Sequence, residues 1–289
     1  MKYTVTGATG NLGSRIIAQL SQQVATDELR AIVHTLSKAT SLEKQGIEIR
    51  QGDYLDVDSM TAALEGTDLL IYVPSKTYLV EQRVHELENS LKAVKQAKVK
   101  KIIFVSFFAD QENNPFVMSP YYGYAPRRLA SSGLEYAVVK NALYADPLVP
   151  YLPELIQREK LIYPIGKEAM SFISLDNSAE AIVKLALTPA LRDQGQTYLL
   201  SQKEPYTMDR LGEIMTNVTG KKIGYEPVTL EEFSEIYESD GDSEELSSMY
   251  RGGAMGLLSG VSEDFRKITG HEAETMAEFL ERGYGEMKD

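Results

Sequence analysis

Three glycines near the N-terminus constrain the fold most strongly. The segment TVTGATGNLGSRII, residues 4–17, places Gly7, Gly10 and Gly13 three residues apart, between a strand-like start and a helix-like continuation. Glycine at 7 permits a tight turn, glycine at 10 lets the main chain approach a diphosphate, and glycine at 13 lets helix and strand pack closely. The first helical N–H groups then face the anion. We predict a dinucleotide-binding segment that also includes Thr9, Asn11 and Leu12.

The rest of the chain supplies the context that this motif needs. Short apolar runs predict strands at residues 2–7, 29–34, 47–51, 68–73, 101–106 and 135–140. Apolar residues at helical spacing separate several of these runs. Such alternation predicts an α/β fold with a doubly wound parallel sheet and helices on both of its faces. A purely structural glycine turn is the alternative interpretation, and a P-loop is excluded because its motif is absent.

The pattern changes after about residue 150. Residues 171–187 predict a strand followed by a helix, 196–201 predict another strand, and the chain from Thr207 onward is mostly helical. We therefore expect a Rossmann domain over 1–155, to which segments within 171–201 return. A smaller, mostly helical subdomain is expected over 202–289.

Charge and composition limit the classes of function. The last segment, residues 226–289, has 17 acidic and 5 basic residues and carries the whole net charge of −12. Such a segment repels phosphate backbones, so we expect no nucleic-acid partner. No run reaches the roughly 18 apolar residues of a membrane span, and no secretory signal is visible, so a cytoplasmic location is expected. The chain has no cysteine and only three dispersed histidines, so we expect no metal.

The end of the second predicted strand indicates the nucleotide. An NAD site usually has an acidic residue there for the ribose hydroxyls, whereas an NADP site omits it and supplies cations. Residues 31–42 contain no acid, and the loop offers His34, Thr35 and Lys38, which favours NADP. After the third strand, Asp53 is a candidate partner for the adenine amino group, with an ordinary turn as the alternative.

Several segments together resemble the atypical short-chain dehydrogenase/reductase superfamily, in particular its NmrA-like branch, which includes bacterial NAD(P)H:quinone oxidoreductases. They are TGATGNLG, GDYLDVDSMTAALEGTDLLIYV, AVKQAKVKKIIFVS and LASSGLEYAVVKNALY. The resemblance covers about the first 200 residues well and the rest loosely. It implies an NAD(P)-binding fold with a substrate cleft between the carboxyl edge of the sheet and a small C-terminal domain. It also implies further site residues around the cofactor and the substrate: Pro74, Ser75, Ser106, Asn141 and Tyr144.

The sequence departs from the main short-chain reductases at the catalytic position. Those enzymes use Tyr-x-x-x-Lys, in which the lysine lowers the pKa of the tyrosine. This chain instead has Tyr124 and Arg128, and Arg127 takes the position of a lysine that many NmrA-like proteins carry. Tyr124 and Arg127 are therefore the catalytic candidates. Pro126 is expected to begin a helix and to leave Tyr124 outside it.

Two classes of function agree with these features. The first is an oxidoreductase that transfers hydride from NADPH to a small electrophile such as a quinone, which needs no positioned acid because water can protonate its product. The second is an NADP(H)-binding redox sensor that regulates a partner without turnover. The sequence leaves open a homodimer or a regulatory protein partner.

Overall fold

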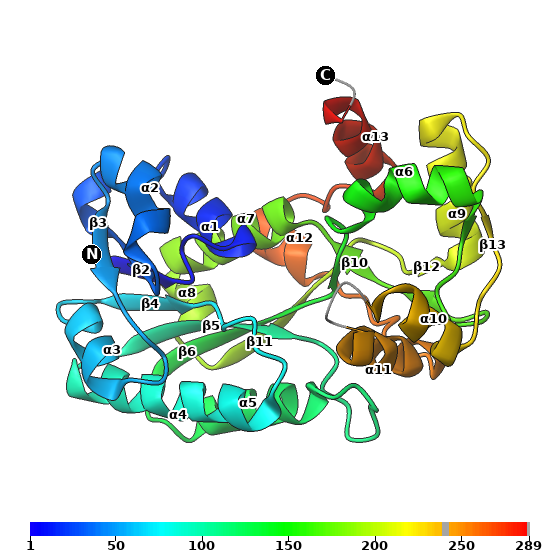
Figure 1. The fold of residues 1–289 in the computed structure, drawn as a ribbon. Coiled ribbons are helices and arrows are strands. Elements are labelled where there is room, and N and C mark those ends of the chain that lie inside the picture. Colours follow the sequence, from blue (N-terminus) through cyan, green and yellow to red (C-terminus); the bar gives the residue numbers. More distant parts are fainter. Residues whose placement is uncertain (239–242, 288–289) are drawn as a thin grey trace. The chain divides into compact units, whose positions relative to one another are not determined.

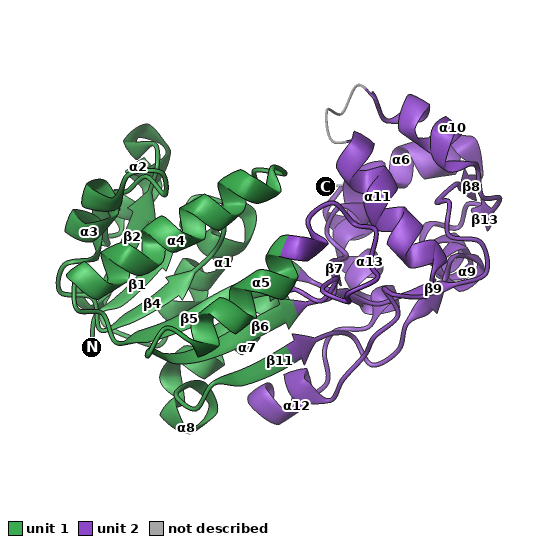
Figure 2. Ribbon diagram, turned by 90° about the horizontal axis from the view of Figure 1, so that it is seen from below, with its two compact units in different colours: residues 1–106, 121–140, 175–198 green, residues 107–120, 141–174, 199–289 purple. Residues whose placement is uncertain are grey.

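The computed structural model describes residues 1–238 and 243–287. The chain forms two compact units, which are coloured separately in Figure 2. The first contains residues 1–106, 121–140 and 175–198, and the second contains 107–120, 141–174 and 199–289. Residues 107–120 and 141–155, which we expected in the first domain, thus lie in the second unit. The reason is that the chain leaves the sheet at the carboxyl ends of its fifth and sixth strands and pairs with later segments.

The first unit is built on a seven-stranded sheet (Figure 1). The strand order is β11-β6-β5-β4-β1-β2-β3, and the pairs β1–β2, β1–β4, β2–β3 and β4–β5 are parallel. This confirms the predicted doubly wound fold. The strands are β1 (Tyr3–Thr6), β2 (Leu29–Val33), β3 (Glu48–Gln51), β4 (Leu69–Tyr72), β5 (Lys101–Phe107), β6 (Glu135–Asn141) and β11 (Gln196–Leu200).

Helices cover both faces of this sheet. Helices α1 and α7 pack together on one face, and α3 and α4 pack together on the other, beside α5 (Figures 1 and 2). Strands β1, β2 and β4 are buried along their whole length, and β4 accordingly has a continuous apolar sequence, whereas β1 and β2 also bury Thr4, Thr6 and Arg30. The helices are α1 (Asn11–Leu20), α2 (Thr40–Lys44), α3 (Val57–Leu64), α4 (Val80–Gln96), α5 (Ser119–Ala130), α7 (Leu175–Leu187) and α8 (Pro189–Arg192), with short 3₁₀ turns η1 (Thr26–Glu28) and η2 (Leu36–Ala39).

The second unit consists mainly of helices with three two-stranded sheets. Its helices are α6 (Leu148–Arg158), α9 (Met208–Thr219), α10 (Leu230–Ile236), α11 (Ser243–Ala254), α12 (Asp264–Thr269) and α13 (Met276–Glu286). Its strands are β7 (Leu143–Tyr144), β8 (Lys160–Leu161), β9 (Ala169–Met170), β10 (Phe172–Ile173), β12 (Tyr206–Thr207) and β13 (Gly224–Tyr225). The helical prediction after Thr207 is confirmed. No helix in the described parts of the chain is long and apolar enough to cross a membrane.

Ion pairs brace the amino edge of the sheet. At the start of β3, the Glu48 carboxylate accepts from Lys2 Nζ at 3.0 Å and from Arg50 Nε at 2.8 Å, and it pairs with the buried Arg30 at 3.1 Å. Lys101, at the start of β5, bonds Glu135 at 2.5 Å and Asp193 at 2.6 Å. Both clusters hold neighbouring strands together where they enter the sheet.

The Glu48 cluster gives a prediction for stability. Burial alone would raise the pKa of Glu48, but the bonds from Arg30, Lys2 and Arg50 outweigh it and lower this pKa from 4.5 to about 2. A lowered folded-state pKa means that the stabilisation is present above the ordinary value and is lost as the pH falls toward 2. With 31% of the side chain exposed, solvent screening reduces the effect, so Glu48→Gln should lower the free energy of unfolding at pH 7 by about 1–2 kcal/mol. Urea unfolding at pH 7 and pH 3 measures this, and an equal loss at both would contradict it.

Candidate functional site

The glycine turn lies at the switch point of the sheet, where strand order reverses between β1 and β4. Ligands of open α/β sheets bind outside the carboxyl ends of the strands at such a point. Gly7 follows β1 in the left-handed region with φ of +59°, which favours glycine. The Thr6 hydroxyl ties the two central strands together, because it accepts from the Val73 main-chain N–H at 2.9 Å. The turn is thus fixed from both strands.

Gly10 and Gly13 have different surroundings. A Cβ at Gly13 would lie 2.2 Å from the Gly7 carbonyl oxygen, so this glycine permits the contact between α1 and the turn. A Cβ at Gly10 would meet a single atom, the Gly7 oxygen at 3.2 Å, and the residue is exposed. Gly10 is the N-cap of α1, with no side chain bonded there and no acidic residue in the first turn. The first N–H groups of α1 have no intrahelical partner, so this exposed surface suits an anion.

The other predicted nucleotide contacts of the first unit lie on loops at the same edge. His34, Thr35 and Lys38 follow β2 and are exposed. Asp53 follows β3, and its Oδ2 atom lies 3.8 Å from His34 Nε2. The fold therefore brings a carboxylate to the end of β2, although the sequence that directly follows β2 contains no acidic residue. Its Oδ1 atom accepts from the Leu55 main-chain N–H at 2.9 Å, which is an Asx turn. Asp53 therefore forms the turn and still has an oxygen directed toward His34.

The segment after β4 is held from inside the protein. Pro74 and Ser75 follow β4, as the resemblance implied for residues that line the cofactor. The Ser75 hydroxyl, however, donates to the buried carboxylate of Glu86 at 2.5 Å. Its side chain is therefore engaged within the protein. The Tyr54 hydroxyl donates to the Val73 carbonyl at 2.6 Å and fixes the same segment from the β3 side.

Ser106 has an unused hydroxyl. It lies near the carboxyl end of β5, is 5% exposed, and its Oγ atom has no hydrogen-bond partner in the described part of the chain. An unsatisfied buried hydroxyl is costly unless a ligand completes it. Together with the exposed cradle at Gly10, it fits a dinucleotide whose two ends lie along this sheet edge.

Two further predicted residues belong to the second unit. Asn141 ends β6 and Tyr144 ends β7. The Asn141 side-chain amide donates to the Tyr144 hydroxyl at 3.1 Å, so the structure brings these two together. Their roles beside a nicotinamide and a substrate stay predictions.

The expectation for Pro126 was wrong. Helix α5 begins at Ser119 and continues through Pro126, so Tyr124 lies within it. A proline inside a helix removes one N–H bond and disturbs the preceding turn. The lost bond is the one to the Tyr122 carbonyl, and the Arg127 guanidinium donates from Nη1 to the adjacent Gly123 carbonyl at 2.5 Å. Buried Tyr121, Ala125 and Leu129 anchor the helix.

Tyr124 and Arg128 meet, but through a carboxylate. The Tyr124 hydroxyl donates to Glu88 at 2.6 Å, and Arg128 Nε donates to the same oxygen at 2.7 Å. The bond to Glu88 raises the pKa of Tyr124. The arrangement is thus opposite to that of Tyr-x-x-x-Lys, where a cation lowers the phenol pKa.

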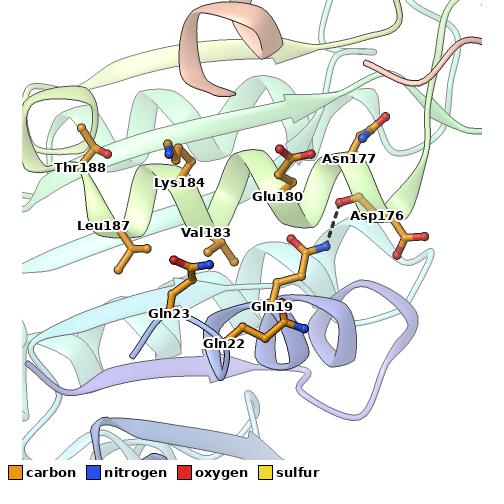
Figure 3. A pocket seen from close by; sticks show the side chains of 10 residues that line it. All are labelled: Gln19, Gln22, Gln23, Asp176, Asn177, Glu180, Val183, Lys184, Leu187 and Thr188. Atoms are coloured by element: carbon orange, nitrogen blue, oxygen red, sulfur yellow. Dashed lines mark hydrogen bonds between the residues drawn. The ribbon is translucent and has the colours of Figure 1, made fainter. Parts of the chain in front are cut away.

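A polar pocket of about 610 Å³ lies elsewhere in the first unit (Figure 3). Its side chains come from the end of α1 and from α7, and the Gln19 amide donates to the Asp176 carbonyl at 3.1 Å. Gln19 lies roughly 13 Å along the helix from Gly10, from the rise of 1.5 Å per residue. This pocket is separate from the glycine turn. Over residues 1–238 and 243–287, no cluster of His, Asp and Glu could hold a metal ion.

Sequence reasoning missed Arg83, Glu86 and Tyr54. Arg83 and Glu86 are 4% and 3% exposed and lie on the buried face of α4. The available signal was their spacing, because Arg83 falls three residues after Val80 and four before Leu87, and Glu86 falls three residues after Arg83. Charged residues on an apolar helix face indicate buried partners.

The fold and this edge define a protein of the Rossmann type. The chain belongs to the NmrA-like family, whose model matches residues 1–280. This confirms the family resemblance.

Three known proteins illustrate the similarity. Quinone oxidoreductase 2 of Escherichia coli (strain K12) is 28% identical over 278 residues, covering 95% of this chain and 96% of that protein. A solved Staphylococcus aureus structure, described as a nucleoside-diphosphate-sugar epimerase, is 39% identical with a TM-score of 0.92, covering 97% of this chain and 100% of its own. Citrobacter sp. triphenylmethane reductase complexed with NADP(H) is 26% identical with a TM-score of 0.91, covering 98% of this chain and 100% of its own.

Proposed function

We propose that this chain is an NADP(H)-dependent oxidoreductase that transfers hydride to a small conjugated electrophile, with quinones as the substrate class. The observation that carries the proposal is the exposed, uncapped start of α1 at Gly10, at the switch point of the sheet. The E. coli relative is named for quinone reduction and the Citrobacter structure contains NADP(H), which supports both parts of the proposal.

The residues have distinct roles in this proposal. The turn from Gly7 to Gly13, with Thr9, Asn11 and Leu12, holds the diphosphate. His34, Thr35 and Lys38 face the 2′-phosphate, and Asp53 lies toward the adenosine. Pro74 and the main chain of Ser75 border the cofactor, and Ser106 offers its free hydroxyl to the nicotinamide end. The bound cofactor would supply the hydride.

The phenol of Tyr124 is a poor proton donor or acceptor at neutral pH, because its bond to Glu88 raises its pKa. A quinone tolerates this, since its reduced oxygens take protons from water. A reaction that needs a tyrosine as its general acid or base does not suit this arrangement. We therefore favour a quinone as the substrate.

A redox sensor is the second candidate. An exposed nucleotide turn, in a chain whose candidate tyrosine is already bonded to Glu88, suits binding without turnover. Steady-state NADPH oxidation with a panel of quinones and triarylmethane dyes separates the two. Turnover supports the enzyme, whereas tight NADPH binding with no turnover on any acceptor supports the sensor.

Nucleotide preference should depend on Asp53 and Lys38. We expect tighter binding of NADP(H) than of NAD(H), but a modest preference because Asp53 lies beside His34. Asp53→Asn should increase the preference by removing a charge that repels the 2′-phosphate, and Lys38→Ala should decrease it. Titration of both nucleotides at fixed ionic strength measures the ratio. Opposite shifts would contradict the assignment of this loop.

Tyr124→Phe should change kcat/KM by less than about fivefold, whereas loss of a general acid costs 10²- to 10⁴-fold. The reason is the engagement of the hydroxyl by Glu88. Arg127→Ala is the comparison, and we expect it to have the larger effect through the anionic cofactor or the substrate carbonyl. A hundredfold loss confined to Tyr124→Phe would identify Tyr124 as a working acid.

A further inference from the structure

Two buried charges on α4 hold the segment that follows β4. The Arg83 guanidinium donates twice to the Thr77 carbonyl, from Nε at 3.1 Å and from Nη2 at 2.6 Å. The Glu86 carboxylate accepts from the Ser75 hydroxyl at 2.5 Å and from the Gln82 amide at 2.9 Å. One helix therefore fixes two alternate residues of the same loop, through a cation and an anion.

Burial makes this arrangement costly unless it serves a purpose. Arg83 and Glu86 are 4% and 3% exposed, and a buried charge that binds only neutral groups recovers little of its desolvation energy. The charges are therefore specific to the loop that they bind.

Arg83 is also fixed from its other side. Its guanidinium carbon lies 5.2 Å from the centre of the Tyr121 ring, a cation–π contact. Tyr121 is fully buried and packs against Phe104 of β5, with ring centres 6.3 Å apart. Through Tyr121 and Phe104, contacts with β5 thus fix the orientation of Arg83. Arg83 in turn holds the loop that follows β4.

The loop held in this way starts at the switch point. Val73 is tied to Thr6 of β1, and Ser75 and Thr77 are tied to α4, so residues 73–77 are fixed at both ends. The side chain of Lys76, between the two tied residues, is exposed. In the proposed function, the outer surface of this loop forms one wall of the nucleotide site.

We propose that Arg83 and Glu86 are positioning residues that preorganise the 73–77 loop for NADP(H), and this rests on the proposed function. They touch neither cofactor nor substrate. They act by fixing main-chain atoms of the loop before the nucleotide binds, which lowers the ordering cost of binding.

The test uses Arg83→Met, which keeps an apolar stem, and Arg83→Lys, which keeps a charge and one type of donor. Hydrogen exchange of the amides of residues 75–79, measured without nucleotide, should accelerate in Arg83→Met and recover partly in Arg83→Lys. The NADPH Kd should rise about tenfold or more in Arg83→Met, because a displaced loop no longer holds its binding groups in place. In Arg83→Lys the Kd should rise less.

Arg30→Met is the matched control. Arg30 is also 4% exposed and also donates to main-chain carbonyls, at Ala63 and Glu65, but at the amino edge of the sheet. The Arg30→Met variant should have a lower unfolding midpoint, but its hydrogen exchange at residues 75–79 and its NADPH Kd should be unchanged. Faster exchange in Arg83→Met with an unchanged NADPH Kd would overturn the positioning role. Equal changes of the NADPH Kd in Arg83→Met and Arg30→Met would overturn it as well. Absence of NADPH binding by the unmodified chain would overturn the proposed function instead.

Discussion

Gly10→Val should abolish measurable NADPH binding in a chain that remains folded. The valine side chain would project from the exposed N-cap of α1 into the space that the diphosphate needs, while the backbone conformation, with φ of −83°, accepts any residue. We expect the Kd to rise at least about a hundredfold, which corresponds to the loss of about 3 kcal/mol of binding energy. Isothermal titration with NADPH measures this directly.

The control is a glycine-to-valine substitution at a site away from the glycine turn. Gly224→Val introduces the same side chain in β13 of the second unit, where the nearest atom to a new Cβ lies 3.8 Å away. It should bind NADPH normally. Both variants should retain the circular dichroism of the unmodified chain. Full binding by folded Gly10→Val would mean that the glycine turn is only architecture.

Gly13→Ala should unfold or severely destabilise the protein. Its Cβ would lie 2.2 Å from the Gly7 oxygen, 2.7 Å from the Gly7 carbonyl carbon and 3.0 Å from the Ala8 Cα, all of them main-chain atoms. Relief requires moving α1 away from β1, so we expect a loss of about 3 kcal/mol or more in unfolding free energy. Urea unfolding measures it.

Gly10→Ala provides the comparison for Gly13→Ala. Its single close contact, at 3.2 Å, is relieved by a small shift, so this variant should lose about 1 kcal/mol or less. Equal stability of the two alanine variants would contradict the division of labour between these glycines. We thus expect Gly10 to be a binding glycine and Gly13 a packing glycine, and the stability of the two alanine variants distinguishes these roles.

The sheet was predictable because its strands carry their own signal. Runs such as 68–73 and 101–106 are apolar on both faces, and β4 and β5 coincide with them to within a residue at each end. The glycine turn was predictable for a related reason, because a positive φ and a close backbone contact both require glycine, and glycine is visible in the sequence. Helix α5 was not, because the buried anchors Tyr121, Ala125 and Leu129 outweigh the local preference of Pro126.

Parts of the candidate site could not be read from local sequence. Asp53 lies beside His34 only because β2 and β3 pair in register, which places their ends together. The engagement of Tyr124 by Glu88 depends on contact between α5 and α4. The spacing of Arg83 and Glu86 places them on the apolar face of α4, but the loop that they bind is known only from the tertiary structure. Each case depends on a tertiary pairing.

The amino edge of the sheet, braced by the Glu48 and Lys101 clusters, has a consequence for how such a chain can diversify. Ion pairs clamp the strands at that edge, whereas the exposed loops that follow β2 and β3, with Gly10, occupy the opposite one. Substitutions among the exposed residues of these loops therefore leave the clamps intact. A chain built in this way can change its nucleotide preference by point changes while its melting behaviour stays nearly constant, so laboratory selection for a new nucleotide preference should find tolerant positions there first.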